Sequence, residues 1–436
     1  MNAVPEAEPG AAAPARAAPV PAGRPAVFIA AARYRRKAYG ANHPLAIPRV
    51  SLAQDLIHAY GALGAGEFLA ARRASDAELE WFHTRAYVAA AKRCEALGRV
   101  KNEWRVRHQL GTLENPYFEQ FCTLSATATG ASVQAAEQVL AGRVAFNPAG
   151  GMHHARADRA RGFCYFNDPV LAILRLKRAG LRVLYVDIDA HHGDAVEEAF
   201  AADPEVATLS LHMDTAYAYP HRGGRLDDVG DPAGEHATVN VPLPPGAHDD
   251  EYRMLFDAVW HPLRERFQPD AVVLQAGTDM LAPDPLGKLS LSTQAFLAVA
   301  RTVLETCPRH ANGTPRLLVT GGGGYHPLAL ARAWTGLWAL LSGRELPEAL
   351  PPAGAALLRA VGWDLDEDEP HYERLFASRL DAVTVRPVRP EILALRDALR
   401  RHPYLKRRDA RRLARDVAGG GVDAAAAAQL PEGKAP

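Results

Sequence analysis

Apolar and polar positions divide the middle of the chain into short apolar runs that alternate with longer helical patterns. The runs are continuous rather than alternating, as in strands that are buried on both faces of a parallel sheet. The expected strands are residues 27–31, 182–188, 206–211, 239–241, 271–275 and 317–320. The helical patterns between them include residues 131–141, 168–178, 250–267 and 293–306. This order predicts a three-layer α/β fold with a single, mainly parallel sheet flanked by helices.

The two ends of the chain differ from this middle part. Residues 1–25 are rich in Ala and Pro without large apolar side chains, so we expect them to be disordered. Between Arg396 and Arg415 there are nine Lys or Arg against two Asp, and a Gly- and Ala-rich stretch follows. We therefore predict a disordered N-terminus (1–25), a folded domain (26–385) and a basic helical tail with a disordered end (386–436).

Composition and charge exclude several classes of protein. Apolar residues make up 48% and charged residues 23%, as in globular proteins. Lys and Arg number 50, as do Asp and Glu, so no overall basic field favours nucleic acid or an anionic membrane. The chain has no apolar run long enough to span a membrane and no apolar core of a secretory signal. The four cysteines are far apart without a CxxC pair, which fits a reducing cytosol and predicts a cytoplasmic protein.

Ionisable residues are concentrated just after the predicted strands, where ligands bind in parallel α/β sheets. The segment RVLYVDIDAHHGD holds five within eight residues: Asp187, Asp189, His191, His192 and Asp194. Residues two apart in an extended chain lie on the same side, so Asp189 and His191 can converge. A helix N-cap would explain Asp194 alone. Burying the whole group unpaired would be costly, which favours a metal or a hydrogen-bonded network.

Three further segments carry candidate groups. DAVVLQAGTDM ends near Asp279, and RLLVTGGGGYHP delivers Tyr325 through four glycines. GGGGY lacks the Lys-Ser/Thr of a P-loop and the spacing of a dinucleotide fingerprint, so a phosphate cradle is disfavoured. His153 and His154 are adjacent in FNPAGGMHHA; alone they would be typical of a solvated pair, but beside these segments they form a candidate acid/base pair.

Asp189, His191 and Asp279 together make a ligand set of two carboxylates and one imidazole, with room for a water. The set is richer in oxygen than the usual catalytic zinc sets, so Fe²⁺, Mn²⁺ and Co²⁺ stay open besides Zn²⁺. Two histidines and a tyrosine would supply a base, an acid and an oxyanion donor. The combination predicts metal-assisted hydrolysis of an amide.

Four motifs in this order resemble the zinc-dependent histone deacetylase family, including its bacterial acetoin-utilisation-type members: GGMHHARADRARGFCYFND, VDIDAHHGD, QAGTDM and GGGGYHP. The similarity runs from about Tyr39 to about residue 340, and HHGD resembles the class I side of the family. The resemblance implies an arginase-like fold and makes residues 26–385 a deacetylase catalytic domain. It also implies one Zn²⁺ per chain, with Fe²⁺ as the alternative, and a structural K⁺ or Na⁺.

The resemblance assigns site residues by position. It places the metal ligands on Asp189, His191 and Asp279. It places the catalytic histidines, their carboxylate partners and the transition-state tyrosine on His153, His154, Asp187, Asp194 and Tyr325. It places the acyl-lysine tunnel and its rim on Gly162, Phe163, Tyr219, Leu286 and Glu114. It places the acetate exit on Arg49, and the monovalent-cation shell on Asp187, Asp189, His191, Ser210 and Leu211.

The expected function is removal of acetyl or acyl groups from lysine in proteins or peptides, with His154 as the base and Tyr325 as the oxyanion donor. Tyr219 stands where the family usually has phenylalanine, which adds a hydroxyl to one tunnel wall. Leu286 stands where the polyamine deacetylases carry a glutamate, which disfavours a polyamine substrate.

Four alternatives have specific points for or against them. An acetyl-polyamine or other small-amide deacetylase shares the fold, whereas an arginase-type enzyme with two manganese ions needs more bridging carboxylates. An inactive acetyl-lysine binder is disfavoured because every position for metal and proton transfer is filled. A nucleic-acid or chromatin factor would rely on the basic tail, which is more typical of a solvated helix or an oligomer contact. Neither nucleic acid nor a membrane is an expected partner, and a homo-oligomer stays open.

Overall fold

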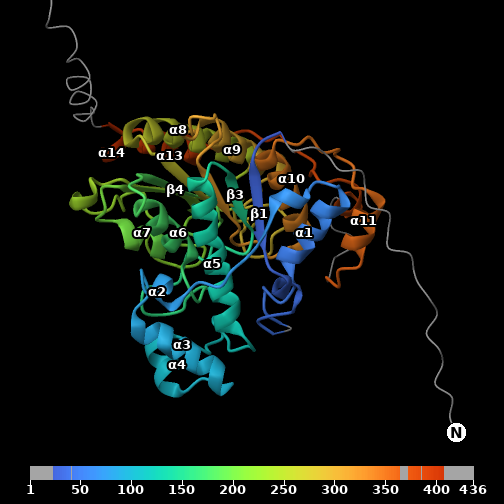
Figure 1. The fold of residues 1–436 in the computed structure, drawn as a ribbon. Coiled ribbons are helices and arrows are strands. Elements are labelled where there is room, and N and C mark those ends of the chain that lie inside the picture. Colours follow the sequence, from blue (N-terminus) through green and yellow to red (C-terminus); the bar gives the residue numbers. More distant parts are fainter. Residues whose placement is uncertain (1–22, 41, 364–371, 384, 407–436) are drawn as a thin grey trace, which may run out of the picture.

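The computed structural model describes residues 23–40, 42–363, 372–383 and 385–406. Its centre is an eight-stranded sheet in which every neighbouring pair is parallel, in the order β2-β1-β3-β8-β7-β4-β5-β6 (Figure 1). The strands are β1 (Ala26–Ala30), β2 (Phe68–Ala70), β3 (Val144–Asn147), β4 (Val183–Asp187), β5 (Val206–Met213), β6 (Thr238–Leu243), β7 (Ala271–Gln275) and β8 (Leu317–Thr320). The predicted fold class is therefore confirmed.

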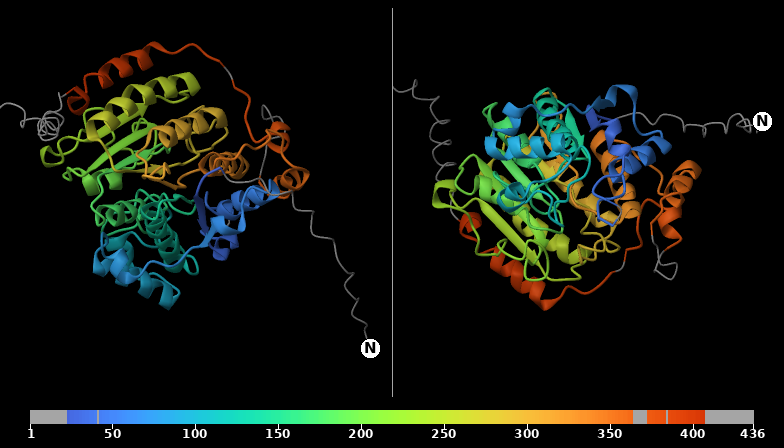
Figure 2. Two further views of the ribbon diagram at one scale, coloured as in Figure 1. Left: turned by 45° about the horizontal axis from the view of Figure 1, so that its top comes forward. Right: turned by 90° about the horizontal axis from the view of Figure 1, so that it is seen from below.

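Helices cover both faces of this sheet (Figure 2). They are α1 (Arg49–Ala59), α2 (Asp76–Leu79), α3 (Arg85–Leu97), α4 (Asn102–His108), α5 (Phe121–Leu140), α6 (Asp168–Lys177), α7 (Asp194–Phe200), α8 (Asp249–Phe267), α9 (Thr293–Thr306), α10 (Pro327–Ser342), α11 (Pro352–Arg359), α12 (Arg374–Ala377), α13 (Pro390–Leu399) and α14 (Pro403–Lys406). Helices α1, α8, α9 and α10 belong to the apolar core on one face, and α5, α6 and α7 belong to the core on the other.

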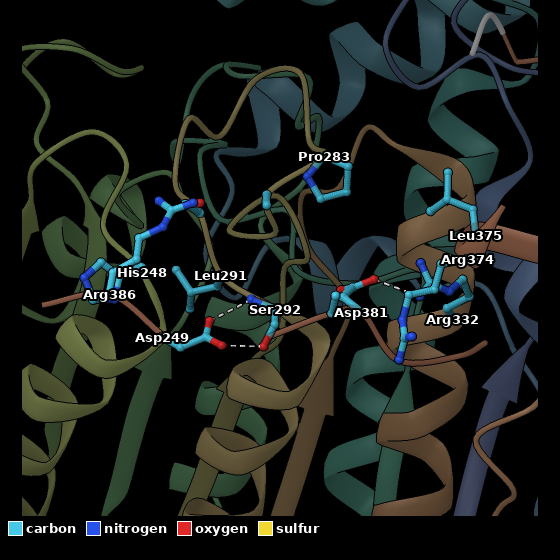
Figure 3. A pocket seen from close by; sticks show the side chains of 13 residues that line it. His248, Asp249, Pro283, Leu291, Ser292, Arg332, Arg374, Leu375, Asp381 and Arg386 are labelled. Atoms are coloured by element: carbon cyan, nitrogen blue, oxygen red, sulfur yellow. Dashed lines mark hydrogen bonds and ion pairs between the residues drawn. The ribbon is translucent and has the colours of Figure 1, made fainter. Parts of the chain in front are cut away.

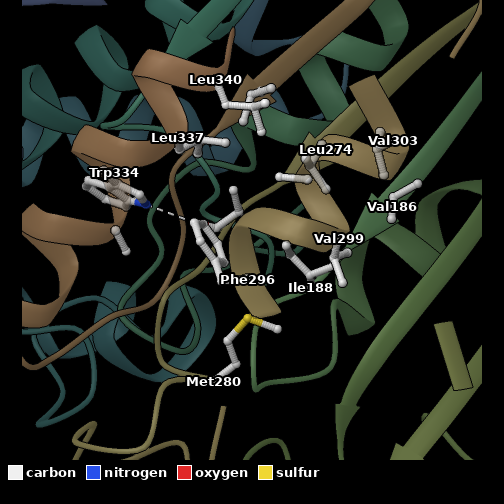
Figure 4. Packing of buried hydrophobic residues seen from close by; sticks show 14 of the residues in the cluster. Val186, Ile188, Leu274, Met280, Phe296, Val299, Val303, Trp334, Leu337 and Leu340 are labelled. Carbon is white, nitrogen blue, oxygen red and sulfur yellow. Dashed lines mark hydrogen bonds between the residues drawn. The ribbon is translucent and has the colours of Figure 1, made fainter. Parts of the chain in front are cut away.

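Alternate residues of each strand enter these two cores because successive side chains of a strand point to opposite faces. In β1, Phe28 packs into the larger core, whereas Val27 and Ile29 pack into the smaller one. Figure 4 shows the larger core, where Phe296 of α9 lies among side chains of β4, β7 and α10. Burial on both faces explains why the strands were recognisable as continuous apolar runs.

The sequence pattern missed two strands and misplaced one helix end. Strand β2 is only three residues long and largely exposed, and β3 is buried but only four residues long. Helix α5 begins at Phe121, ten residues before the predicted start at Ala131. The intervening segment is rich in Ser and Thr and contains Gly130, all of which lower helix propensity. Gly130 is needed because a Cβ there would overlap the backbone at Arg72.

The C-terminal part of the described chain lies on α8, where α13 and α14 pack. Residues 407–436 and 1–22 lie outside the described residues, so the predicted division into three parts stays a prediction. All four cysteines are buried and free. Within the described ranges, no helix is both long and apolar enough to cross a membrane.

Candidate active site

The candidate site lies at the carboxyl edge of five adjacent strands, β3, β8, β7, β4 and β5. Four of their terminal residues, Asn147, Thr320, Gln275 and Asp187, are aligned across the sheet by the parallel register. The segments that follow these strands therefore begin at the same level of the same edge. This alignment brings together side chains from His153 to Tyr325, which are more than 170 residues apart in the sequence.

The three predicted metal ligands converge. One ligand atom from each of Asp189, His191 and Asp279 lies within 4.8 Å of the other two, and all three residues are buried. His191 Nδ1 lies 3.2 Å from Asp189 Oδ1 and 2.9 Å from Asp279 Oδ2. The second oxygen of each carboxylate is held by the protein: Ala190 N–H donates to Asp279 Oδ1 at 2.8 Å, and Gln275 Nε2 donates to Asp189 Oδ2 at 2.7 Å. The other two oxygens, Asp189 Oδ1 and Asp279 Oδ2, face His191 Nδ1, and Asp189 Oδ1 also accepts a hydrogen bond from His191 N–H at 2.9 Å.

The charges of this group favour a divalent cation. Burial raises the pKa of Asp279 to about 7, with a further contribution from the negative charge of Asp189. Burial alone would lower the pKa of His191, but the charges of Asp279 and Asp189 and the hydrogen bonds to them together raise it well above its ordinary value. Two buried carboxylates against one imidazole leave excess negative charge, which a bound metal ion would neutralise. The donor set and the charge both fit the expected metal.

Glycine is required beside these carboxylates. A Cβ at Gly323 would overlap the carboxylate of Asp279, and one at Gly277 would overlap that of Asp189. In the same GGGG segment, Gly322 and Gly324 have φ angles of 155° and 131°. The segment therefore combines close approach with backbone conformations that other residues rarely adopt.

The adjacent histidines form two His–Asp pairs. His153 Nδ1 lies 2.8 Å from Asp187 Oδ2, and His154 Nδ1 lies 2.9 Å from Asp194 Oδ1. Their Nε2 atoms face each other at 3.0 Å, a distance at which one nitrogen donates a proton and the other accepts it.

The two imidazoles differ in protonation. Burial lowers the pKa of His153, but the charges of Asp187 and Asp189 and the hydrogen bond to Asp187 together outweigh it, and the pKa rises to about 9. Burial and the positive charge of His153 lower the pKa of His154 to about 3. His153 is therefore the charged member of the pair and donates its Nε2 proton, and His154 is neutral with an Nε2 electron pair that accepts this hydrogen bond.

Three side chains that the sequence did not single out hold this machinery in place. Arg161 Nη1 donates to Asp194 Oδ2 at 2.5 Å, and Tyr185 donates its hydroxyl to Asp187 Oδ2 at 2.6 Å. Gln275, described above, is the third. Arg161 is 15% exposed and belongs to RADRAR, a run typical of a solvated loop. Nothing local in that run indicates a bond to a carboxylate 33 residues away.

Tyr325 faces the metal ligands from the end of the GGGG segment. Its ring centroid lies 6.2 Å from that of His191 and 6.1 Å from that of Phe163. Its backbone N–H donates to Asp284 Oδ2 at 2.7 Å, so Asp284 positions it, a contact that no sequence motif indicated. Burial, with the charge of Asp279, keeps the pKa of Tyr325 well above its ordinary value. The hydroxyl stays protonated and can donate a hydrogen bond.

Two of the predicted tunnel residues, Gly162 and Tyr219, lie against His154, and Phe163 lies beside Tyr325. Gly162 has a φ of 55°, and a Cβ there would overlap the ring of His154. Tyr219 packs edge-on against His154 with centroids 4.8 Å apart. Glu114 accepts a hydrogen bond from Gly162 N–H at 2.5 Å, so the predicted rim residue lies beside a predicted tunnel residue; the tunnel itself stays a prediction. Leu286 is half-buried, and its N–H donates to the carboxylate of Asp284.

The remaining predicted residues lie around this centre. Arg49 Nη1 donates to Gly324 O at 2.8 Å and lines a cavity of about 90 Å³ together with Tyr39 and Met152. Ser210 is paired in register with Asp187, and its hydroxyl is bonded to His212 Nδ1 at 2.8 Å. Leu211 is buried in the larger core. The acetate exit and the monovalent-cation shell stay predictions.

A parallel sheet that gathers a buried Asp–His–Asp group, two His–Asp pairs and a tyrosine at one edge defines a metal-dependent α/β hydrolase. The histone deacetylase domain model matches residues 43–341. The chain is 39% identical to histone deacetylase 8 of Xenopus tropicalis over 305 residues, which are 70% of this chain and 80% of that protein. It is also 39% identical over 321 residues to histone deacetylase RPD3 of Saccharomyces cerevisiae, covering 72% and 71% of the two proteins. The chain belongs to the histone deacetylase family.

Solved structures agree with this assignment. The crystal structure of an HDAC homologue from Aquifex aeolicus matches with a TM-score of 0.81 and 39% identity, over 86% of this chain and 100% of that one. A crystal structure of an HDAC homologue complexed with SAHA matches equally well. The similarity therefore extends beyond the span of the domain model to most of the described fold.

Proposed function

We propose that this protein is a zinc-dependent lysine deacetylase that hydrolyses the amide of acetylated lysine in proteins or peptides. The observation that carries the proposal is the convergence of Asp189, His191 and Asp279 beside a neutral, carboxylate-oriented histidine. Membership of the histone deacetylase family supports the same reaction. Four free, buried cysteines support a cytoplasmic location.

Asp189 Oδ1, His191 Nδ1 and Asp279 Oδ2 would hold the metal ion. When bound, Zn²⁺ supplies polarisation of the amide carbonyl and lowers the pKa of a water. His154 Nε2 accepts a proton from the attacking water and later delivers it to the lysine amine. Asp194 fixes the His154 tautomer in which Nδ1 carries the proton, as carboxylates do in hydrolase triads.

His153 and Tyr325 stabilise the negative charge that develops on the substrate oxygen. His153 is held in its charged form by Asp187 and acts electrostatically. Tyr325 donates a hydrogen bond from its protonated hydroxyl. Phe163 and Tyr219 are the proposed walls of the lysine tunnel. Leu286 offers no carboxylate to a distal ammonium, so the proposal favours acetyl-lysine over acetylated polyamines.

Tyr325→Phe tests this proposal. The variant should bind substrate but lose about 10²–10³-fold in kcat, because one oxyanion donor is removed. Mass spectrometry of an acetyl-lysine peptide measures the loss, with acetylspermidine as the parallel substrate. Near-normal kcat in the variant would remove Tyr325 from the reaction. If the wild type turned over acetylspermidine faster than the acetyl-lysine peptide, the proposed substrate would be an acetylated polyamine instead.

A further inference from the structure

The adjacent histidines of the proposed active site lie on a histidine segment, residues 151–156, that belongs to none of the helices and strands given above. Asp168, the first residue of α6, holds the beginning of this segment. Its Oδ2 accepts a hydrogen bond from Gly151 N–H at 3.0 Å, and its Oδ1 accepts one from Met152 N–H at 2.8 Å. Asp168 is fully buried, and Ser132 donates its hydroxyl to the same carboxylate at 2.5 Å. The carboxylate therefore fixes the backbone immediately before the two histidines.

Asn167 holds the rest of the histidine segment. Its Nδ2 donates to His153 O at 3.2 Å and to Ala155 O at 3.0 Å. The backbone N–H of Asn167 donates to His83 Nε2 at 3.0 Å, so the ring proton of His83 is on Nδ1, which donates to Arg156 O at 3.1 Å. Asn167 and His83 are both buried. Together with Asp168, these side chains bind five backbone groups of the segment.

The glycines before the histidines allow the segment to pack closely. A Cβ at Gly150 would overlap Asp168 Oδ2, and one at Gly151 would overlap the backbone oxygen of Gly321, in the GGGG segment that leads to Tyr325. Gly151 also has a φ of 91°, which other residues rarely adopt. The histidine segment therefore packs directly between Asp168 and the GGGG segment, which limits its movement.

Asn167 also caps α6, and this structural role uses a different atom. Its Oδ1 accepts a hydrogen bond from Val170 N–H at 3.1 Å, as in other helix N-caps. The bonds to the histidine segment come from Nδ2 of the same amide. A substitution can therefore remove the bonds to the segment and keep the cap.

We propose that Asn167 and Asp168 are positioning residues for the deacetylation reaction, because they hold the backbone that places His154 Nε2 at the attacking water. This inference rests on the proposed function. Asp187 and Asp194 orient the two imidazole rings, whereas Asn167 and Asp168 fix the chain that carries these rings. A misplacement of about 1 Å can cost roughly 10²-fold in rate. Loss of the contacts should therefore lower kcat rather than weaken substrate binding.

Two isosteric substitutions test the proposal. Asp168→Asn places an NH₂ group where a backbone N–H needs an acceptor, so it removes one of the two bonds to Gly151 and Met152. Asn167→Asp removes both bonds that Nδ2 donates but keeps the oxygen that caps α6. We expect each variant to lose about 10- to 100-fold in kcat on an acetyl-lysine peptide, at unchanged KM and metal content. Amide hydrogen exchange in residues 148–157, followed by mass spectrometry without substrate, should become faster in both.

Asp381→Asn is the matched control, because Asp381 is also a carboxylate that binds the beginning of a helix. It accepts hydrogen bonds from Thr293 N–H of α9 at 2.9 Å and from Arg332 Nη2 at 2.8 Å, beside a cavity of about 310 Å³ (Figure 3). None of the residues that line this cavity belongs to the metal group or to the histidine segment. Asp381→Asn should lower the free energy of unfolding but leave kcat of the folded, metal-loaded protein within about twofold.

The results separate positioning from a general loss of stability. Unchanged exchange of residues 148–157 in both variants, or faster exchange with unchanged kcat, would overturn the proposal. An equal loss of kcat in Asp381→Asn would also overturn it, because the effect would then be a general one. If the wild type did not deacetylate the peptide, the proposed function would fail, and the exchange measurement would still decide whether Asn167 and Asp168 hold the segment.

Discussion

The contact between Arg161 and Asp194 makes the variant Asp194→Asn informative. An asparagine side chain has one oxygen that accepts and one NH₂ that donates. Arg161 Nη1 lies 2.5 Å from Asp194 Oδ2, and Arg156 Nη2 lies 3.5 Å from the same atom. Both arginines can only donate, so the asparagine must turn its oxygen toward them. Its NH₂ then faces His154 Nδ1 and forces the imidazole proton onto Nε2, where the base needs a free electron pair.

The magnitude follows from the bond that fixes this orientation. Reversing the amide would give up a charge-assisted hydrogen bond to Arg161, worth about 1.5–3 kcal/mol. The productive tautomer is disfavoured by at least that amount. A barrier raised by the same free energy corresponds to a loss of about 10- to 150-fold in kcat.

The assay is kcat on an acetyl-lysine peptide, with metal content measured on the same samples. Metal content should be unchanged in Asp194→Asn, because Asp194 is not a ligand. In a background that carries both Arg156→Met and Arg161→Met the asparagine can reverse, so the additional loss from Asp194→Asn should shrink by about tenfold. Asp158→Asn, an exposed acid on the same loop, is the matched control and should stay within about twofold. Independent, additive losses at Asp194 and at the two arginines would refute the reasoning.

Two further predictions concern stability. Burial lowers the pKa of His83 to about 4 from an unfolded value near 6.5. The unfolded state therefore binds the proton more tightly than the folded state does. The contribution of His83 to the free energy of unfolding is fully present above pH 6.5 and falls by about 3 kcal/mol as the pH drops toward 4. The glutamine of His83→Gln can retain both hydrogen bonds of the ring, to Arg156 O and from Asn167 N–H. The variant should therefore flatten the curve of unfolding free energy against pH between about pH 6.5 and 4. An unchanged slope would contradict the assignment to His83. Phe296→Ala should lower the free energy of unfolding, measured in denaturant melts, by roughly 3–5 kcal/mol because Phe296 is fully buried. Arg301→Ala, at an exposed position of the same helix, is the control and should change little. A loss below about 1 kcal/mol in Phe296→Ala would contradict the close packing of Phe296 in the larger core.

The sequence was most informative where structure is determined locally. Buried parallel strands are continuous apolar runs, so β7 and β8 were predicted to the residue. Asp189 follows β4 and Asp279 follows β7. The two aspartates meet because β4 and β7 are neighbours in the sheet. Helix α10 had no such local signature. It is buried around its whole circumference, so it lacks the amphipathic stripe on which helix prediction depends.

The residues that position the catalytic groups were harder to predict, because they act across long separations in the chain. Gln275 holds Asp189 across 86 residues, and Asp284 holds the backbone of Tyr325 across 41. Neither contact leaves a periodicity or a motif of its own. The convergence of the candidate groups was predictable because ionisable residues are costly to place at the end of a buried strand unless they have partners there.

The central claim is that three side chains hold one metal ion in a single-metal hydrolase. Elemental analysis of the purified wild type and of Asp279→Ala, with folding of the variant checked by circular dichroism, tests it most directly. The account predicts one metal ion per wild-type chain, with Zn²⁺ as the proposed occupant, and loss of that ion from the folded Asp279→Ala variant. Two ions per wild-type chain, or full occupancy in Asp279→Ala, would contradict it.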